Sequence, residues 1–329
     1  MRTAAIDIGT NTLLLLIAES ASGHPDDLVP IVEFARIVRL GEGVDRTRAF
    51  KAEAVQRTLS ALEEAATLMH AHSVANVAVV GTSAMRDASG GEPILAFVRQ
   101  QMGAEVRIIS GDEEAQLTFD GALAGLDVQG KVTVFDIGGG STEIVHGEVS
   151  DGGTTIVHAR SYDIGSVRLT ERCVKHDPPS ADEVRSIENE IATVLKDAPH
   201  HPAQTVIGIA GTLTTLAAVS LEMSPYDAER IHGYIMSTDM MRHVTHKLSR
   251  MPIAMRSEVR GLEPKRADVI VAGGLIAQGV MQHLRAPELR VSDRGVRWGL
   301  ARATCRTANG ANGMARGEAM ARHEDRVRN

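Results

Sequence analysis

The sequence predicts an α/β protein of two domains that meet at a cleft. Strand patterns alternate with amphipathic helix patterns along most of the chain. The stretch AAIDIGTNTLLLLIAE at residues 4–19 returns in similar form as VFDIGGGSTEIVHG at residues 134–147, with the same order of strand, aspartate, small-residue turn and strand. The 329 residues, 43% of them hydrophobic, can supply two separate cores.

The first predicted domain covers residues 1–126. Apolar runs predict strands, and apolar residues spaced three and four apart predict helices. Strands are expected at residues 3–9, 12–20, 30–44, 76–88 (opening into a loop) and the start of 105–126. Helices are expected at residues 50–72, 91–103 and the end of 105–126.

The pattern restarts at residue 127, which predicts a second domain over residues 127–305. It opens with two strands joined by a turn, and Ser180 and Glu183 are spaced as a capping box for a later helix. The expected elements are strands at 131–140 and 142–150, a helix at 179–197, a strand, glycine loop and helix at 205–221, helices at 239–251 and 266–284, and a strand, turn and helix at 288–305. Residues 306–329 have little apolar content, and we expect a mostly disordered tail there.

Composition argues against several classes of function. The net charge of −7 gives no reason to expect DNA or an anionic membrane as a partner. The longest apolar run, LLLLIA, is far shorter than the roughly 20 residues that cross a bilayer. The two cysteines, Cys173 and Cys305, form no CxxC motif and fit a reducing cytoplasm.

Charge is unevenly spread along the chain. Residues 110–150 hold eight acids and one lysine, whereas residues 240–306 hold thirteen Lys and Arg and five acids. An acidic centre beside a basic wall suits a metal ion that acts on a polyanion. Two ordinary solvated faces are the alternative interpretation.

The two repeated turns predict a phosphate-binding cleft. Asp7 and Asp136 each stand where an apolar strand stops, and a buried carboxylate there needs a cation or hydrogen-bond donors. The glycines and hydroxyls that follow can direct backbone N–H groups at a phosphate. The candidate phosphate-binding residues are Thr10, Asn11, Gly138, Gly139, Gly140, Ser141 and Thr142.

Magnesium is the cofactor that these acids suit, because it prefers oxygen ligands and retains waters. Its candidate ligands are Asp136, Glu143 and Asp7. For Glu143 the alternative is a solvated position at the end of a strand. In SGDEEAQL, Glu113 and Glu114 either favour a helix N-terminus or align a water for attack on phosphorus, and spacing leaves both open.

Two further phrases add candidates. In GTSAMRDA, Ser83 and Arg86 suit phosphate oxygens, with a surface pair between Arg86 and Asp87 as the alternative. In GIAGTLTT, Gly211 and Thr212 form a third glycine–hydroxyl loop, which either holds another part of the substrate or is a common strand–helix turn.

Histidines rank low as metal ligands in this sequence. The pairs His243–His246 and His200–His201 have no third ligand in view, and we expect them to be solvated.

Taken together, these phrases resemble the exopolyphosphatase / guanosine-pentaphosphate phosphatase family of the actin-like, sugar-kinase and heat-shock-ATPase superfamily. The resemblance covers almost the whole chain to about residue 305. The matching phrases are AIDIGTNT, RLGEGVD, GTSAMRDA, ISGDEEAQL, FDIGGGSTE, DIGSVRLTE, GIAGTLTTLAA, GLEPKRADVIVAGGLI and VSDRGVRWGL. The resemblance implies two actin-like (ribonuclease-H-like) domains with an interdomain cleft.

The resemblance also implies a hydrolase that removes terminal orthophosphate from inorganic polyphosphate, from the 5′ end of guanosine pentaphosphate, or from both. The family's catalytic glutamate corresponds to Glu114, which would position and deprotonate the attacking water, with Glu113 as the neighbouring alternative. Asp136 and Glu143 correspond to the family's metal-associated acids, with Asp7 opposite. The family is Mg²⁺-dependent, often stimulated by K⁺ and commonly dimeric. Longer members carry additional C-terminal helical domains that grip long polymers, so this shorter form leaves short-chain and nucleotide substrates open.

Other functions compatible with the turns remain open at this point. One is an ATP-dependent small-molecule kinase of the same superfamily, which would transfer phosphate to an acceptor instead of water. Another is a nucleotide- or alarmone-binding regulatory module with little turnover, in which closure of the cleft is the output.

Overall fold

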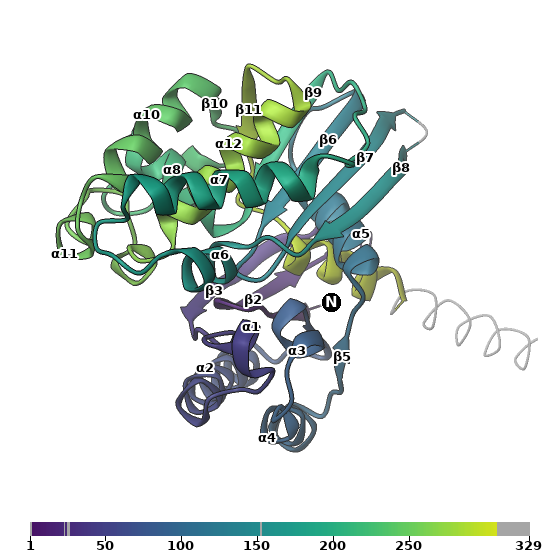
Figure 1. Ribbon diagram of the computed structural model, residues 1–329. Helices are drawn as coiled ribbons and strands as arrows, with labels where there is room; N and C mark the ends of the chain where they lie inside the picture. Colours follow the sequence, from purple (N-terminus) through teal and green to yellow (C-terminus); the bar gives the residue numbers. More distant parts are fainter. Residues whose placement is uncertain (1, 23, 25–26, 152, 308–329) are drawn as a thin grey trace, which may run out of the picture.

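The computed structural model describes residues 2–22, 24, 27–151 and 153–307, which form two α/β halves packed against each other (Figure 1). Each half is built on one mixed sheet, with strand order β3-β2-β1-β4-β5 in the first and β10-β11-β9-β6-β7-β8 in the second. In both sheets three antiparallel strands continue into two parallel strands, and the second sheet adds β10 antiparallel to β11 at its edge. The internal repeat that the sequence predicts is therefore confirmed at the level of topology.

The first half contains five strands and the helices between them. Its strands are β1 (Arg2–Ile8), β2 (Thr12–Glu19), β3 (Val29–Ile37), β4 (Asn76–Gly81) and β5 (Val106–Ile108). Its helices are α1 (Val44–Thr47), α2 (Ala52–Ala71), α3 (Ser83–Asp87), α4 (Glu92–Phe97), the π-helix η2 (Val98–Met102) and α5 (Gly111–Ala122).

The second half begins with the repeated strand pair and ends with a strand beside β9. Its strands are β6 (Gly130–Ile137), β7 (Thr142–Ser150), β8 (Gly153–Tyr162), β9 (Thr205–Ile209), β10 (Ile235–Ser237) and β11 (Glu288–Val291). Its helices are α6 (Ser166–Cys173), α7 (Ala181–Leu195), α8 (Ala210–Ser220), α9 (Ala228–Ile231), α10 (Thr238–Ser249), α11 (Ile253–Arg256), the 3₁₀ turn η3 (Pro264–Arg266) and α12 (Ile270–Leu284). The capping box of Ser180 and Glu183 at the start of α7 is confirmed.

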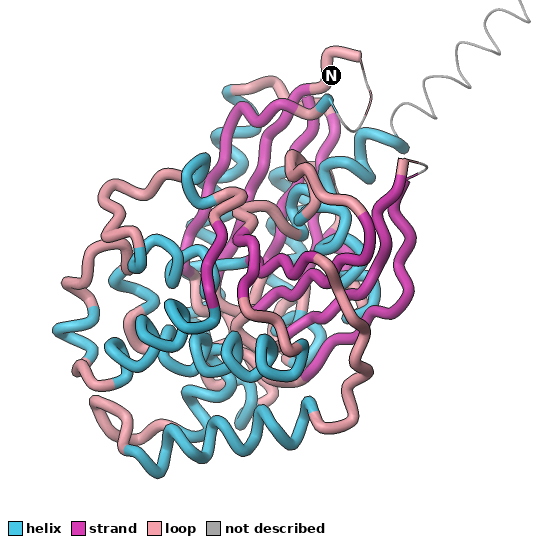
Figure 2. The backbone as a smooth tube through the Cα atoms, turned by 90° about the horizontal axis from the view of Figure 1, so that it is seen from above, coloured by secondary structure: helices cyan, strands magenta, loops and turns pink. Residues whose placement is uncertain are grey.

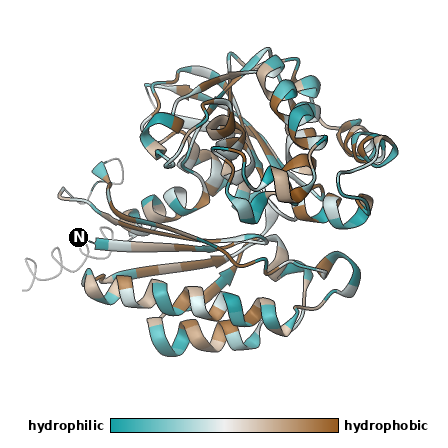
Figure 3. Cartoon of the chain, turned by 90° about the vertical axis from the view of Figure 1, so that its left-hand side faces the viewer, coloured by the Kyte–Doolittle hydropathy of each residue, from teal (hydrophilic) through white to brown (hydrophobic). Residues whose placement is uncertain are grey.

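The central strands β1 and β2 of the first sheet are buried on both faces, which explains why they read as continuous apolar runs. Along β1, Ala4 and Ile6 pack in the core under α2 and α4, whereas Ala5 faces the opposite cluster. Figure 3 shows these apolar strands between the two lower helices and the upper half of the molecule.

Two helices pack across the two halves. Helix α5 lies on β6, β7 and β8 of the second sheet, where Phe119 is fully buried. The helix at residues 296–307, which follows the second sheet in the chain, packs on the first sheet through Trp298. The boundary at residues 126/127 stays a prediction, since these helices join the two halves. Figure 2 shows the strands of the two sheets as separate groups with helices around and between them.

Two local predictions were wrong. The segment after β4 was expected as a loop, but it forms the short helix α3 because Ser83 to Asp87 close a helical turn over Thr82. The expected loop with Gly211 and Thr212 is the first turn of α8, which begins directly at Ala210 with φ +67°. The predicted tail lies almost wholly outside the described residues. Within those residues, every helix is too short or too polar to cross a membrane.

Candidate active site

A cleft of about 970 Å³ separates the two sheets and receives both repeated turns. Its lining comes from the carboxyl ends of β1 and β6, the first turn of α8 and the segment around η3. Most of the predicted site residues line it: Asp7, Thr10, Asn11, Ser83, Glu114, Asp136, Gly138, Gly139, Gly140, Ser141, Gly211 and Thr212. The two turns thus face one shared space, as the sequence predicts.

The two turns have the same internal geometry. The N–H of Gly9 donates to the carbonyl of Thr12 at 3.1 Å, and the N–H of Gly138 donates to the carbonyl of Ser141 at 3.0 Å. Among the residues that the structure describes, the N–H groups of Gly139 and Gly140 have no acceptor in the protein. Such adjacent free donors at a glycine turn form a concave site for an anion.

The second turn presses against the first half. A Cβ added at Gly140 would lie 2.4 Å from the Ser83 Oγ, and one added at Gly139 would lie 3.0 Å from the Thr10 Cβ. Glycine is therefore required at residue 140 for close approach. This contact brings Thr10, Ser83 and the second turn together at one end of the cleft.

Four carboxyl groups converge behind the turns. Asp7, Glu114, Asp136 and Glu143 are all at most 8% exposed. Burial raises the pKa of Asp7 to about 7, and the charge of Glu143 adds to that rise. Burial, followed by the charges of Glu143 and Asp7, raises the pKa of Asp136 well above its usual range. These mutual effects place the four acids within electrostatic reach of one another.

Glu114 and Glu113 occupy different environments. Glu114 lines the cleft, and its Oε2 accepts a 2.7 Å hydrogen bond from Arg86 Nη1. Burial and the charge of Glu143 raise the Glu114 pKa, and Arg86 opposes that rise. The Glu113 side chain is 38% exposed and pairs with Arg107, while its backbone N–H donates to the capping hydroxyl of Ser110. Only Glu114 is directed at the turns.

The remaining predicted residues lie just behind the cleft surface. Arg86 donates to the carbonyl of Ile109 as well as to Glu114, and it does not pair with Asp87. The hydroxyl of Thr142 donates to the Ile164 carbonyl at 2.6 Å, and Glu143 accepts from Ser161 at 2.6 Å.

Two arginines of the site were not predicted from the sequence. Arg266 of η3 donates to the hydroxyl of Thr12 at 3.3 Å, and its guanidinium lies against Gly211. Arg168 of α6 contacts the second turn at Gly140. These arginines lie in the segments GLEPKRAD and DIGSVRLTE. Neither segment carries a local pattern that predicts its contact with a phosphate-binding turn.

The acids fit a hydrated divalent cation. In the described residues no group of three or more His, Cys, Asp or Glu is arranged to enclose a metal ion. The Asp7 Oδ1, however, is buried without a hydrogen-bond partner, and the charges of Arg297 and Glu143 act on its carboxyl group in opposite directions. Magnesium commonly takes one or two carboxylates and fills its other positions with waters and substrate phosphates. Asp7, Asp136 and Glu143 suit that mode of binding.

The chain is similar to a known protein family, to named relatives and to solved structures. The model of the Ppx/GppA phosphatase family matches residues 16–305. Exopolyphosphatase 2 of Mycobacterium tuberculosis is 39% identical over 316 residues, which cover 91% of this chain and 97% of the relative. The crystal structure of the Aquifex aeolicus Ppx/GppA family member has a TM-score of 0.78 at 33% identity, over 94% of this chain and 99% of its own. An exopolyphosphatase structure from Cytophaga hutchinsonii has a TM-score of 0.82 at 26% identity, over 93% and 98%. The predicted fold of two actin-like domains is confirmed by these comparisons.

Proposed function

The chain belongs to the Ppx/GppA phosphatase family, and from that premise we propose that it is an exopolyphosphatase. It hydrolyses the terminal phosphoanhydride bond of inorganic polyphosphate and releases orthophosphate. The observation that carries this proposal is the position of Glu114: a buried carboxylate, held by Arg86, in the same cleft as two phosphate-binding turns.

The residues divide the reaction between them. The terminal phosphate lies between the turns, where the N–H groups of Gly139 and Gly140 and the hydroxyls of Thr10 and Ser83 hold its oxygens. Glu114 orients a water and accepts its proton as the water oxygen bonds to phosphorus and the bridging P–O bond breaks. The shortened chain leaves with the bridging oxygen.

Magnesium, bound by Asp7, Asp136 and Glu143, would neutralise charge on the phosphate oxygens. Deprotonated acids must be available for it, and a nearby cation favours the ionised form of each acid. Arg86 favours the ionised form of Glu114 by the same electrostatic effect, since its guanidinium opposes the rise in the Glu114 pKa that burial and the charge of Glu143 cause. We further propose K⁺ stimulation, a homodimer, a cytoplasmic location and activity on the 5′-terminal phosphate of guanosine pentaphosphate.

Phosphate release tests the proposal directly. Short polyphosphate, long polyphosphate, guanosine pentaphosphate and ATP are compared side by side with the same preparation. Release from a polyphosphate without an added acceptor is the expected result. ATP consumption that depends on an added sugar or acid would instead indicate a kinase, and tight nucleotide binding without phosphate release would indicate a regulatory module.

A further inference from the structure

We propose that Arg168 is a positioning residue that couples the second phosphate-binding turn to the first half of the molecule. This inference rests on the proposed function, because the turn matters only if it holds the terminal phosphate. Arg168 lies in the first turn of α6 and is 7% exposed. Its guanidinium reaches across the junction between the halves.

Three hydrogen bonds of Arg168 divide between the two halves. Nε donates to the Gly140 carbonyl of the turn at 2.6 Å. Nη1 donates to Asp45 of α1 at 2.8 Å, and Nη2 donates to Asp87 of α3 at 2.6 Å. One rigid, planar guanidinium therefore fixes the turn relative to two carboxylates of the other half.

The backbone around Arg168 strengthens this connection. The N–H groups of Val167 and Arg168 both donate to the Gly139 carbonyl, at 2.9 and 3.0 Å, and the N–H of Ser166 donates to the Gly138 carbonyl at 3.0 Å. The start of α6 thus accounts for the carbonyls of the turn, and the N–H groups of Gly139 and Gly140 are left for the phosphate. A movement of Arg168 would be transmitted to those donors.

Because Arg168 bonds to both halves, the position of the second turn depends on the two halves being packed together. If the halves separated, Arg168 would lose Asp45 and Asp87, and its guanidinium would no longer fix the turn relative to the first half. The complete turn therefore forms only when the first half is in place, with Ser83 and Thr10 against Gly140 and Gly139.

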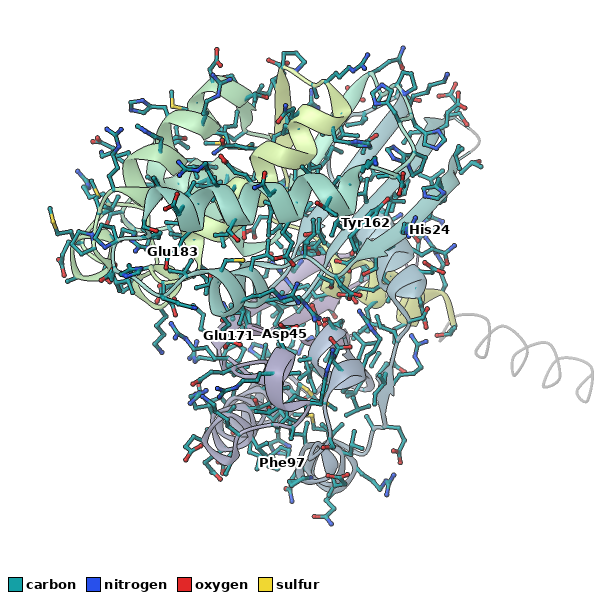
Figure 4. The ribbon with its side chains drawn as sticks, in the orientation of Figure 1. His24, Asp45, Phe97, Tyr162, Glu171 and Glu183 are labelled. Carbon is teal, nitrogen blue, oxygen red and sulfur yellow. The ribbon has the colours of Figure 1, made fainter. Side chains whose placement is uncertain are left out.

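Arg172 provides a matched control. It lies one turn further along α6 and pairs with the same Asp45 and with Glu190, but it makes no hydrogen bond to the turn. Figure 4 shows Asp45 beside Glu171, whose carboxylate accepts the N–H of Gly43, at the junction of α6 and α1. Both arginines thus join the same interface, and only Arg168 reaches Gly140.

The test compares Arg168→Lys and Arg172→Ala in the full chain, with sodium tripolyphosphate as substrate. A lysine keeps the charge but cannot reach three acceptors. We expect Arg168→Lys to lower kcat at least about tenfold with KM within about threefold, because misplaced donors weaken the transition state more than ground-state binding. Arg172→Ala is expected to keep kcat within about threefold, so equal losses in the two variants, or an unchanged kcat in Arg168→Lys, would overturn the proposal.

Amide hydrogen exchange gives a readout that does not depend on activity. Exchange in residues 136–142 and 164–169 is expected to be faster in Arg168→Lys and unchanged in Arg172→Ala, and equal protection in both variants would contradict the coupling. If the unaltered chain releases no phosphate, the proposed function fails, and this exchange experiment still decides the role of Arg168. If Arg168→Lys does not fold, Asp87→Asn replaces it, with the same split between kcat and KM expected at a smaller size.

Discussion

Glu143 lies directly opposite Asp136 in the antiparallel pair of β6 and β7. In the first half, the residue opposite Asp7 is Leu14. The two hairpins share a backbone plan, but only the second places two acids face to face. Burial raises the pKa of both acids. The charges of Glu143 and Asp7 add to the rise at Asp136, whereas hydrogen bonds from Ser161 and Ser141 and the charge of Arg86 oppose the rise at Glu143. This asymmetry favours the second hairpin as the stronger side of the proposed magnesium site.

Removal of the Glu114 carboxylate should abolish most of the activity. Glu114→Gln keeps the size of the side chain and a hydrogen-bond partner for Arg86, but it cannot accept the proton of the attacking water. We expect a loss of at least about 10²-fold in kcat, measured as phosphate release. The matched control is Glu113→Gln, which alters an exposed acid one residue away and should keep kcat within about threefold. A reversed order of the two variants would assign the role to Glu113.

Asp136 should control the metal requirement. Chelation of divalent cations is expected to stop phosphate release, and added Mg²⁺ is expected to restore it. Asp136→Asn should raise the Mg²⁺ concentration for half-maximal rate at least about tenfold, because an amide is a weaker ligand than a carboxylate. Asp112→Asn, at the exposed start of α5, is the control. An unchanged Mg²⁺ dependence in Asp136→Asn would exclude this acid as a ligand.

Much of the fold was predictable because its signals are local. Strand runs such as residues 4–8 and 132–137 carry their own pattern, and the repeated turn revealed that the two halves share a plan. Helix α5 of the first half packs on the second sheet, and the helix at residues 296–307 packs on the first sheet. This arrangement was not predictable, since the pattern of an amphipathic helix does not specify which sheet the helix covers.

In the site, too, local features were predictable and contacts between distant residues were not. Asp7 and Asp136 stand at strand ends and were identified from that position. The contacts of Arg168 with Asp45 and Asp87 join residues 123 and 81 positions apart, and no local pattern encodes such pairs. His201 was expected to be solvated, but its ring packs 4.6 Å from that of His146. The sequence did not predict this contact, because the three-dimensional neighbours of a loop histidine cannot be read from its sequence neighbours.

The close approach of the two turns predicts that Gly140→Ala impairs activity. The added Cβ would meet the Ser83 Oγ and push the second turn away from the first half. We expect kcat/KM to fall at least about tenfold. The double variant Ser83→Ala/Gly140→Ala should lose less than the sum of the two single variants, because it removes the Oγ that the methyl group meets. If the double variant loses the sum of the two single effects, the contact is not the cause.

The histidine cluster predicts an acid-sensitive fold. His146 is buried on β7 and bonds to the hydroxyl of Thr133 through Nδ1 at 2.8 Å, while His158, His200, His201 and His283 surround it. Burial and, after it, the charges of these histidines lower the His146 pKa from 6.5 to about 4.

The direction in which pH changes stability follows from the protonation of His146 in the folded and unfolded chains. Between pH 4 and 6.5 the unfolded chain binds a proton at His146 that the folded chain excludes, so the stability from the neutral ring is complete above pH 6.5 and is lost as the pH falls. We expect its contribution to the free energy of unfolding to decline by about 2 kcal/mol over this range. Urea unfolding at pH 7, 5.5 and 4.5 measures it. His146→Asn, which retains a partner for Thr133, should reduce the pH dependence, whereas His243→Asn on the exposed face of α10 should leave it unchanged. Equal pH dependence in the unaltered chain and His146→Asn would show that this histidine does not control acid stability.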